Sequence, residues 1–209
     1  MKLIYQTHSP YARKVLVAAH EMGLADRLEV VHHETSPTRR NEEVFGLNPL
    51  GKVPVLILDD GLALFDSSVI CEYLDGLHGC AKLIPAEPRA RFLSLRLQAL
   101  AQGVCDAGIA VRHETERRPE PYRYPAMRDG HIEKLTTAYD FLERDETLTG
   151  ATRPAICIGQ VALATALSWL EFRGLPAFAP GRPRLAAWYR GVLRRPSMLA
   201  TPLCGDTVD

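Results

Sequence analysis

The sequence predicts an α/β domain at the N-terminus followed by an all-helical domain. Short apolar runs typical of strands alternate with helical patterns in the first third of the chain, and only helical periodicity follows. Between the two parts, a stretch containing Gly, Lys and two prolines interrupts both patterns. We therefore expect domains at residues 1–78 and 88–209, joined by a linker at residues 79–87.

The first expected elements are a strand at Leu3–Tyr5 and a helix from Pro10 to Met22. Ser9 is a favoured N-cap residue, and the fixed φ of proline suits Pro10 to the first helical position. The Ser9 hydroxyl would then lie where unpaired N–H groups and the helix dipole favour an anion. Taken alone, Ser9 is better explained as a helix cap and nothing more.

A second strand is expected at Leu28–His33, then a short helix capped at or near Thr38 and a loop at residues 46–51. Two further strands, Val53–Leu58 and Leu62–Leu64, flank Asp-Asp-Gly at positions 59–61, the strongest hairpin signal in the chain. A third helix is expected from Ser67, and its apolar residues should be buried: Val69, Ile70, Tyr73, Leu74 and Leu77. A β-α-β unit followed by a hairpin and a closing helix is the thioredoxin-like order.

Beyond the linker every predicted element is a helix. Two helices, separated by Pro119-Glu120-Pro121, each have one apolar face, marked by Leu93, Leu97, Leu100 and Val104 and by Ile132, Leu135, Tyr139 and Leu142. Residues 161–170 are apolar almost all round, which is typical of a helix buried in the middle of a bundle. A last clear helix is expected from Pro183, and the chain from Pro196 onward should be short or irregular.

The composition excludes several classes of protein. Lys plus Arg and Asp plus Glu both number 25, so no net charge attracts nucleic acid or an anionic membrane. An odd number of cysteines without C-x-x-C spacing argues against a disulfide framework and a zinc site: Cys71, Cys80, Cys105, Cys157 and Cys204. Without a signal-like start or an apolar run of ~18 residues, we expect a cytoplasmic protein with no membrane or metal partner.

Three segments together resemble the glutathione transferase family of the bacterial, serine type. They are Ser9-Pro10-Tyr11 at the first helix, Lys52-Val53-Pro54 before the hairpin and Asp66-Ser67 before the third helix. The resemblance extends along the chain and implies a thioredoxin-like N-terminal domain followed by a helical bundle. One departure is the start of the buried helix, where the family commonly has Ser or Thr and, three residues later, Asp. Here Cys157 and Gln160 stand, and Cys is a poor N-cap.

The resemblance assigns Ser9 the catalytic role of stabilising the glutathione thiolate. A free thiol has a pKa near ~8.5, and lowering it by about two units requires ~2.7 kcal/mol of preference for the anion. One hydrogen bond to a charged group supplies ~1.5–3 kcal/mol and a helix N-terminus ~0.3–1 kcal/mol. One hydroxyl at the start of the helix therefore suffices without a base.

The resemblance also implies which residues would hold the rest of glutathione. A cis peptide before Pro54 would turn the backbone N–H and C=O of Val53 toward the cysteinyl part. Asp66 would bind the ammonium of the γ-glutamyl group and Ser67 its carboxylate, although the pair is equally a helix cap. Lys52 would meet the glycyl carboxylate, or is simply solvated.

The second substrate would contact the long helix after the linker. Asp106, Arg112 and His113 are polar residues that follow an apolar stretch there, and Tyr11 is a further candidate. The hydroxyls of Tyr5 and Tyr11 compete with Ser9 for the catalytic role, although both residues suit the core.

The resemblance implies a glutathione transferase in which glutathione, as co-substrate, attacks a small hydrophobic electrophile in detoxification. It also implies a homodimer. Two alternatives stay open: a binding or regulatory protein without catalysis, and glutathione-dependent reduction or isomerisation. The fold does not separate them.

Overall fold

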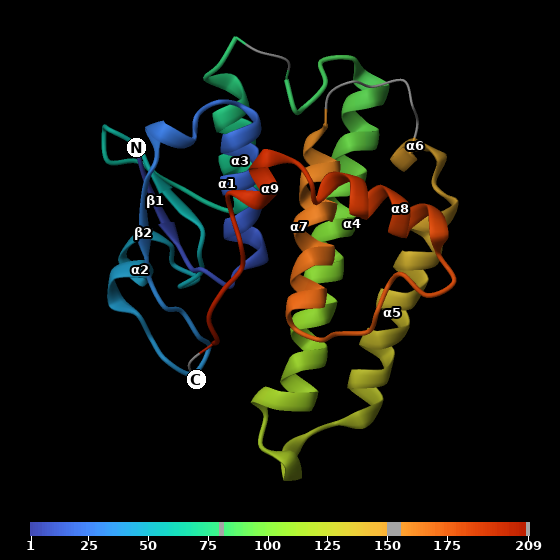
Figure 1. Ribbon diagram of the computed structural model, residues 1–209. Coiled ribbons are helices and arrows are strands. Elements are labelled where there is room, and N and C mark those ends of the chain that lie inside the picture. Colours follow the sequence, from blue (N-terminus) through green and yellow to red (C-terminus); the bar gives the residue numbers. More distant parts are fainter. Residues whose placement is uncertain (80–81, 150–155, 208–209) are drawn as a thin grey trace.

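The computed structural model describes residues 1–79, 82–149 and 156–207, and Figure 1 shows the arrangement of the elements. Two residues of the predicted linker, 80 and 81, lie outside the described residues, and Cys80 is one of them. The last two residues of the predicted second domain, 208–209, also lie outside them. The limits assigned to the domains and the linker remain a prediction.

The N-terminal part is a four-stranded mixed sheet in the order β2-β1-β3-β4. Strand β1 runs parallel to β2 and antiparallel to β3, and β4 pairs antiparallel with β3. This is the predicted β-α-β unit followed by a hairpin and a helix. Its elements are β1 (Lys2–Tyr5), α1 (Pro10–Glu21), the short 3-10 helix η1 (Ala25–Arg27), β2 (Glu29–His32), α2 (Glu42–Leu47), β3 (Val55–Ile57), β4 (Ala63–Leu64) and α3 (Ser67–Gly76).

The alternation of side chains along the strands divides the sheet between two cores. Leu3 and Leu56 face α1 and α3 and belong to the large core that continues into the helical domain. Ile4 and Val55 point to the opposite face, where they pack with Val44 of α2. The sheet is therefore covered by helices on both faces.

Three local expectations in this part were wrong. Asn41, not Thr38, caps α2, because its Oδ1 accepts the Val44 N–H at 3.2 Å. The helix then continues through Gly46 to Leu47, where a loop was expected. Val69 was expected in the core but is 47% exposed. It lies on the outer side of α3, opposite the buried Ile70 and Leu74.

The C-terminal part is all-helical, as predicted. Its elements are α4 (Pro88–Arg112), the π-helical turn η2 (His113–Arg117), the 3-10 turn η3 (Glu120–Tyr122), α5 (Pro125–Arg144), α6 (Glu146–Thr149), α7 (Ile158–Phe172), α8 (Pro183–Val192) and α9 (Pro196–Leu199). Helix α7 is buried on almost all sides and packs along α4 and against α1. Among the described residues, no helix is long and apolar enough to cross a membrane.

The start of α7 is closed in spite of its cysteine cap. The Gln160 side chain reaches back, and its Oε1 accepts the backbone N–H of Cys157 at 3.1 Å. Gly159 allows the close approach to α4, since a Cβ there would lie 2.4 Å from the carbonyl oxygen of Ser94. Its N–H donates to the Ser94 hydroxyl at 3.3 Å.

Buried hydrogen bonds near the start of α1 join the N-terminal part to the C-terminal part. Arg13, on α1, donates to the Ser168 hydroxyl of α7 at 2.5 Å and to the carbonyl of Met198 on α9 at 3.1 Å. The Trp169 indole N–H donates to the carbonyl of His8 at 3.1 Å. The chain after α9 then returns to the N-terminal part (Figure 1), where the Cys204 N–H donates to the Thr7 carbonyl at 3.3 Å.

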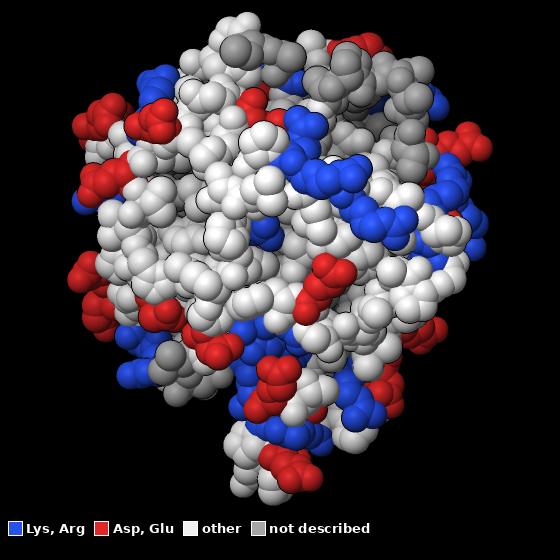
Figure 2. All heavy atoms as spheres, viewed as in Figure 1, with Lys and Arg blue, Asp and Glu red and all other residues white. Residues whose placement is uncertain are grey.

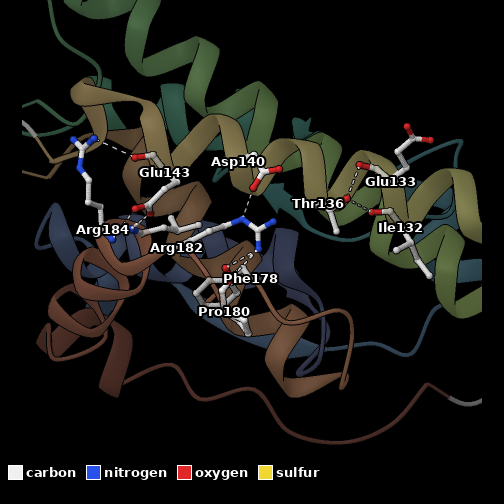
Figure 3. A network of polar contacts seen from close by, with 10 residues as sticks. Ile132, Glu133, Thr136, Asp140, Glu143, Phe178, Pro180, Arg182 and Arg184 are labelled. Atoms are coloured by element: carbon white, nitrogen blue, oxygen red, sulfur yellow. Dashed lines mark hydrogen bonds and ion pairs between the residues drawn. The ribbon is translucent and has the colours of Figure 1, made fainter.

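Helix α5 carries a carboxylate that caps α8. Glu143 accepts the backbone N–H groups of Arg184 at 3.1 Å and Leu185 at 2.8 Å, in the first turn of α8. Beside it, Arg182 donates from its Nε to Asp140 at 2.7 Å (Figure 3). These contacts satisfy amide groups that have no partner within a helix.

Replacing Glu143 by Ala should lower the free energy of unfolding by about 1 kcal/mol, the usual cost of a lost cap. Glu143→Gln keeps an acceptor and should cost less. Urea unfolding followed by circular dichroism measures both, with Glu133→Ala as the control because that side chain is exposed on the same helix. Equal stability of Glu143→Ala and Glu133→Ala would contradict the capping role.

Candidate functional site

A cavity of about 870 Å³ lies between the two parts of the molecule. Its size is within the range of small-molecule sites. Tyr5, the rival hydroxyl, does not line it, whereas the ten residues assigned to catalysis or binding from the sequence all do: Ser9, Tyr11, Lys52, Val53, Pro54, Asp66, Ser67, Asp106, Arg112 and His113. The structure therefore brings segments that are far apart in the sequence to one place.

Ser9 is both a helix cap and part of the cavity wall. Its backbone is extended (φ −87°, ψ 121°), and its Oγ accepts the Ala12 N–H at 3.2 Å. Accepting this bond leaves the hydroxyl hydrogen for another partner. The side chain can therefore cap α1 and donate to an anion in the cavity.

The loop before β3 presents backbone groups to the same cavity. The Val53–Pro54 peptide is cis, as the resemblance implied. The buried side chain of Asn48 fixes the loop, because its Nδ2 donates to the Lys52 carbonyl at 2.9 Å and its Oδ1 accepts the Leu50 N–H at 3.0 Å. Gly51 has a φ of +60°, and a Cβ there would collide with the Phe45 ring. Asn48 was not identified from the sequence.

Asp66 and Ser67 lie where α3 begins. Asp66 caps the helix, since its Oδ1 accepts the Ser68 N–H at 2.9 Å. Gln102, on α4, donates to Asp66 Oδ2 at 3.4 Å, so the helical part also contacts the start of α3. Burial alone would raise the pKa of Asp66, but the Ser68 amide, the Lys14 ammonium and Gln102 outweigh it, and the pKa is lowered. The carboxylate is thus ionised at neutral pH and can bind a cation.

The two tyrosine hydroxyls differ in their placement. Tyr11 donates to Asp106, and burial, the neighbouring Cys105 and this bond raise its pKa, so it stays protonated. Its hydroxyl hydrogen is thereby engaged. Tyr5 belongs to the core, and its hydroxyl donates to the Thr7 carbonyl at 3.4 Å. Neither hydroxyl is as available to an anion as that of Ser9.

At the other end of the cavity the lining is basic. Arg112 is nearly buried and forms an ion pair with Glu116 at 3.0 Å. His8, Arg117 and Arg173 also line this end, and the sequence did not single them out. No local pattern marks them, because α1, η2 and the end of α7 meet only in the folded chain. Burial lowers the pKa of His8, so its imidazole is neutral at pH 7.

Comparison with known proteins identifies the family. Residues 8–77 match the family model of the glutathione S-transferase N-terminal domain. Over 206 residues the chain is 30% identical to the uncharacterized GST-like protein YibF of Escherichia coli K12, an alignment that covers 96% of this chain and 98% of YibF. The chain belongs to the glutathione transferase family.

Solved structures of family members agree with the fold over almost the whole chain. A glutathione transferase family member from Pseudomonas fluorescens Pf-5, solved with bound glutathione, superposes with a TM-score of 0.91. It is 37% identical, and the match covers 98% of this chain and 99% of that one. A glutathione S-transferase from Methylobacillus flagellatus KT, also with glutathione bound, is 35% identical with a TM-score of 0.84, covering 97% and 99%. The predicted fold, a thioredoxin-like domain followed by a helical domain, is confirmed.

No group of three or more His, Cys, Asp and Glu side chains that could hold a metal ion occurs among the described residues of this family member. The cysteines described are all free thiols, and Cys71, Cys105 and Cys157 are buried. Burial raises the pKa of Cys71 to about 11.

The lowered pKa of Asp66 predicts how the stability of the protein changes at acidic pH. A carboxyl group whose pKa is lower in the folded state contributes stability above its unfolded pKa, and loses it as the pH falls through the folded pKa. Asn also caps helices, so Asp66→Asn should be less stable than wild type at pH 7, and the difference in stability should shrink as the pH falls below the pKa of ~3.9 of an unperturbed Asp. Urea unfolding across this pH range measures this, and a difference that persists unchanged in acid would contradict it.

Proposed function

We propose that this protein is a glutathione transferase that ionises glutathione beside Ser9. The observation that carries the proposal is the Ser9 hydroxyl, which lies at the N-terminus of α1 in the cavity that Val53, Asp66 and Ser67 also line. Its hydrogen is available, and the unpaired amides of the helix favour an anion there.

In the proposed binding mode, each residue recognises a part of glutathione by charge or hydrogen bonding. Asp66 pairs with the ammonium of the γ-glutamyl group, and the Ser67 hydroxyl and backbone N–H contact its carboxylate. The backbone of Val53 pairs with the cysteinyl amide, and Lys52 meets the glycyl carboxylate. These contacts would place the thiol at the Ser9 hydroxyl.

The chemical step needs no base from the protein. The thiol releases its proton to solvent, and the Ser9 O–H donates to the thiolate that remains. The thiolate then attacks an electrophilic carbon, a C–S bond forms, and the leaving group departs with its electron pair. The hydroxyl and the helix N-terminus together supply the ~2.7 kcal/mol that a pKa lowered by about two units requires.

Family members support the binding of glutathione and of its conjugates. The Pseudomonas fluorescens Pf-5 protein has been solved with glutathione and with S-(propanoic acid)-glutathione, and the latter structure is 38% identical with a TM-score of 0.87. Serine rather than cysteine at position 9 favours transfer over disulfide exchange, because a hydroxyl forms no mixed disulfide.

The proposal is tested by retention on immobilised glutathione together with conjugation of an activated aryl chloride at pH 7. We expect both. Retention without conjugation would favour the non-catalytic alternative, and activity confined to disulfides or isomerisable substrates would favour reduction or isomerisation. Absence of both retention and conjugation would refute the proposal.

Substitutions of Ser9 separate capping from catalysis. Ser9→Ala should cost about 1 kcal/mol of stability, whereas Ser9→Asp should be tolerated because Asp caps equally well. Both should lose conjugation: Ala has no donor, and Asp adds a like charge that raises the pKa of the bound thiol. Ser9→Cys should gain disulfide-exchange activity.

The pH profiles of conjugation in the three variants, compared with their melting curves, provide the measurement. Full conjugation activity in a folded Ser9→Ala protein would remove Ser9 from the mechanism. Attention would then move to Tyr11 and to the backbone N–H groups at the start of α1.

We also propose a homodimer. Val69 on α3 and Phe92 on α4 are large apolar residues that are exposed in the single chain. An ion pair between Arg91 and Glu72 at 2.6 Å joins these same helices. Light scattering at micromolar concentration should give twice the 23.2 kDa of one chain, and a stable species at the monomer mass would refute the dimer.

A further inference from the structure

The cavity carries more positive charge than the proposed glutathione contacts use. Among its described lining residues, two are acidic, Asp66 and Asp106, and five are basic: Arg40, Lys52, Arg112, Arg117 and Arg173. The whole chain, by contrast, has a formal net charge of zero. Figure 2 shows a group of Lys and Arg side chains in the lower centre of the molecule, with Asp and Glu side chains next to them. Three of the five basic residues form ion pairs with carboxylates outside the lining, Glu42, Glu116 and Asp206. The lining itself still presents more cations than anions to a ligand, which favours an anion other than the carboxylates of glutathione.

Arg173 is the most unusual member of this group. It follows the last turn of α7, and its side chain is 5% exposed. Its Nη1 donates to the Asp206 carboxylate at 2.9 Å, but Nε and Nη2 are buried and have no hydrogen-bond partner among the described residues. The C-terminus of a helix favours a cation, which accounts for the charge. It does not account for buried donors without acceptors, which are rare in native structures.

His8 repeats this pattern immediately before Ser9. Both of its ring nitrogens are buried and unpaired among the described residues. Arg112 and Arg173 are both close enough to lower its pKa. Unpartnered donors from two separate elements therefore converge on the end of the cavity next to the proposed thiolate.

The C-terminal segment covers these same groups. A Cβ at Gly205 would lie 3.7 Å from His8 Nδ1, and Thr207 lines the cavity. Asp206 binds Arg173 while its own side chain is 93% exposed. An exposed carboxylate gains little from such a pair, so a competing anion can take its place.

We propose that the electrophile carries a carboxylate, which Arg173 binds with Arg112 and His8 beside it. This inference rests on the proposed function and replaces a purely hydrophobic second substrate by an anionic one. A planar guanidinium binds a carboxylate through two parallel hydrogen bonds. The substrate carboxylate displaces Asp206 and gives the unpartnered nitrogens of Arg173 an acceptor.

Two stable ligands of nearly equal size test the charge directly. S-(carboxymethyl)glutathione and S-(carbamoylmethyl)glutathione differ in a carboxylate against a neutral amide close to the sulfur. By titration calorimetry on the full chain, we expect the carboxylate ligand to bind about tenfold more tightly. S-methylglutathione reports on the glutathione contacts alone.

Arg173→Gln should abolish the preference, so that the carboxylate and the amide ligand bind about equally tightly. Arg194→Gln removes the same charge from an exposed position outside the cavity and should keep it. Asp206→Asn removes the competing carboxylate from an exposed side chain and should increase the preference, so the test does not depend on whether Arg173→Gln folds.

Equal binding of the two ligands by the wild type would overturn the inference while the proposed function stands. The same holds if Asp206→Asn leaves the preference unchanged, or if a folded Arg173→Gln retains it. If none of the three ligands binds, the proposed function fails and this inference fails with it.

Discussion

The contact between α1 and α7 fixes the position of the residue on which the proposed chemistry depends. The Trp169 indole N–H donates a hydrogen bond to the His8 carbonyl. The Arg13 guanidinium donates to the Ser168 hydroxyl and to the carbonyl of Met198. Ser9 lies between these two anchored points of the chain. Removing one partner of a buried charged contact is costly, so this arrangement resists movement. The helical part thereby orients a hydroxyl that belongs to the thioredoxin-like part.

The electrostatics of the cavity follow from where the chain places its charged side chains. The Asp66 carboxylate, kept ionised by the Ser68 amide and Lys14, is suited to an ammonium. The opposite end, near Arg112 and Arg173, is suited to anions. A zwitterionic peptide with a thiolate matches this distribution, and a second anion matches the remainder. The protein has no net charge, but positive and negative groups are separated within this one cavity. This separation would orient the bound ligand.

The sequence predicts best where structure is decided locally. Ser9-Pro10 and Asp66-Ser67 begin helices because capping depends on a few neighbouring residues, and the apolar run in α7 predicts its burial. The cap of α2 was misplaced because Ser, Thr and Asn residues near it are all acceptable caps. His8 and Arg173 could not be found at all. Their burial depends on the C-terminal segment crossing back over the cavity, and no pattern in one sequence reports such a contact.

The central claim is that the Ser9 hydroxyl stabilises a thiolate, and the state of the bound thiol tests it most directly. The ultraviolet absorbance of the thiolate can be titrated with pH in the complex of the wild-type chain with glutathione. The account predicts a pKa about two units below the ~8.5 of a free thiol, and a value near the free one in folded Ser9→Ala. Bound glutathione that titrates in the wild type as it does in water would contradict the account.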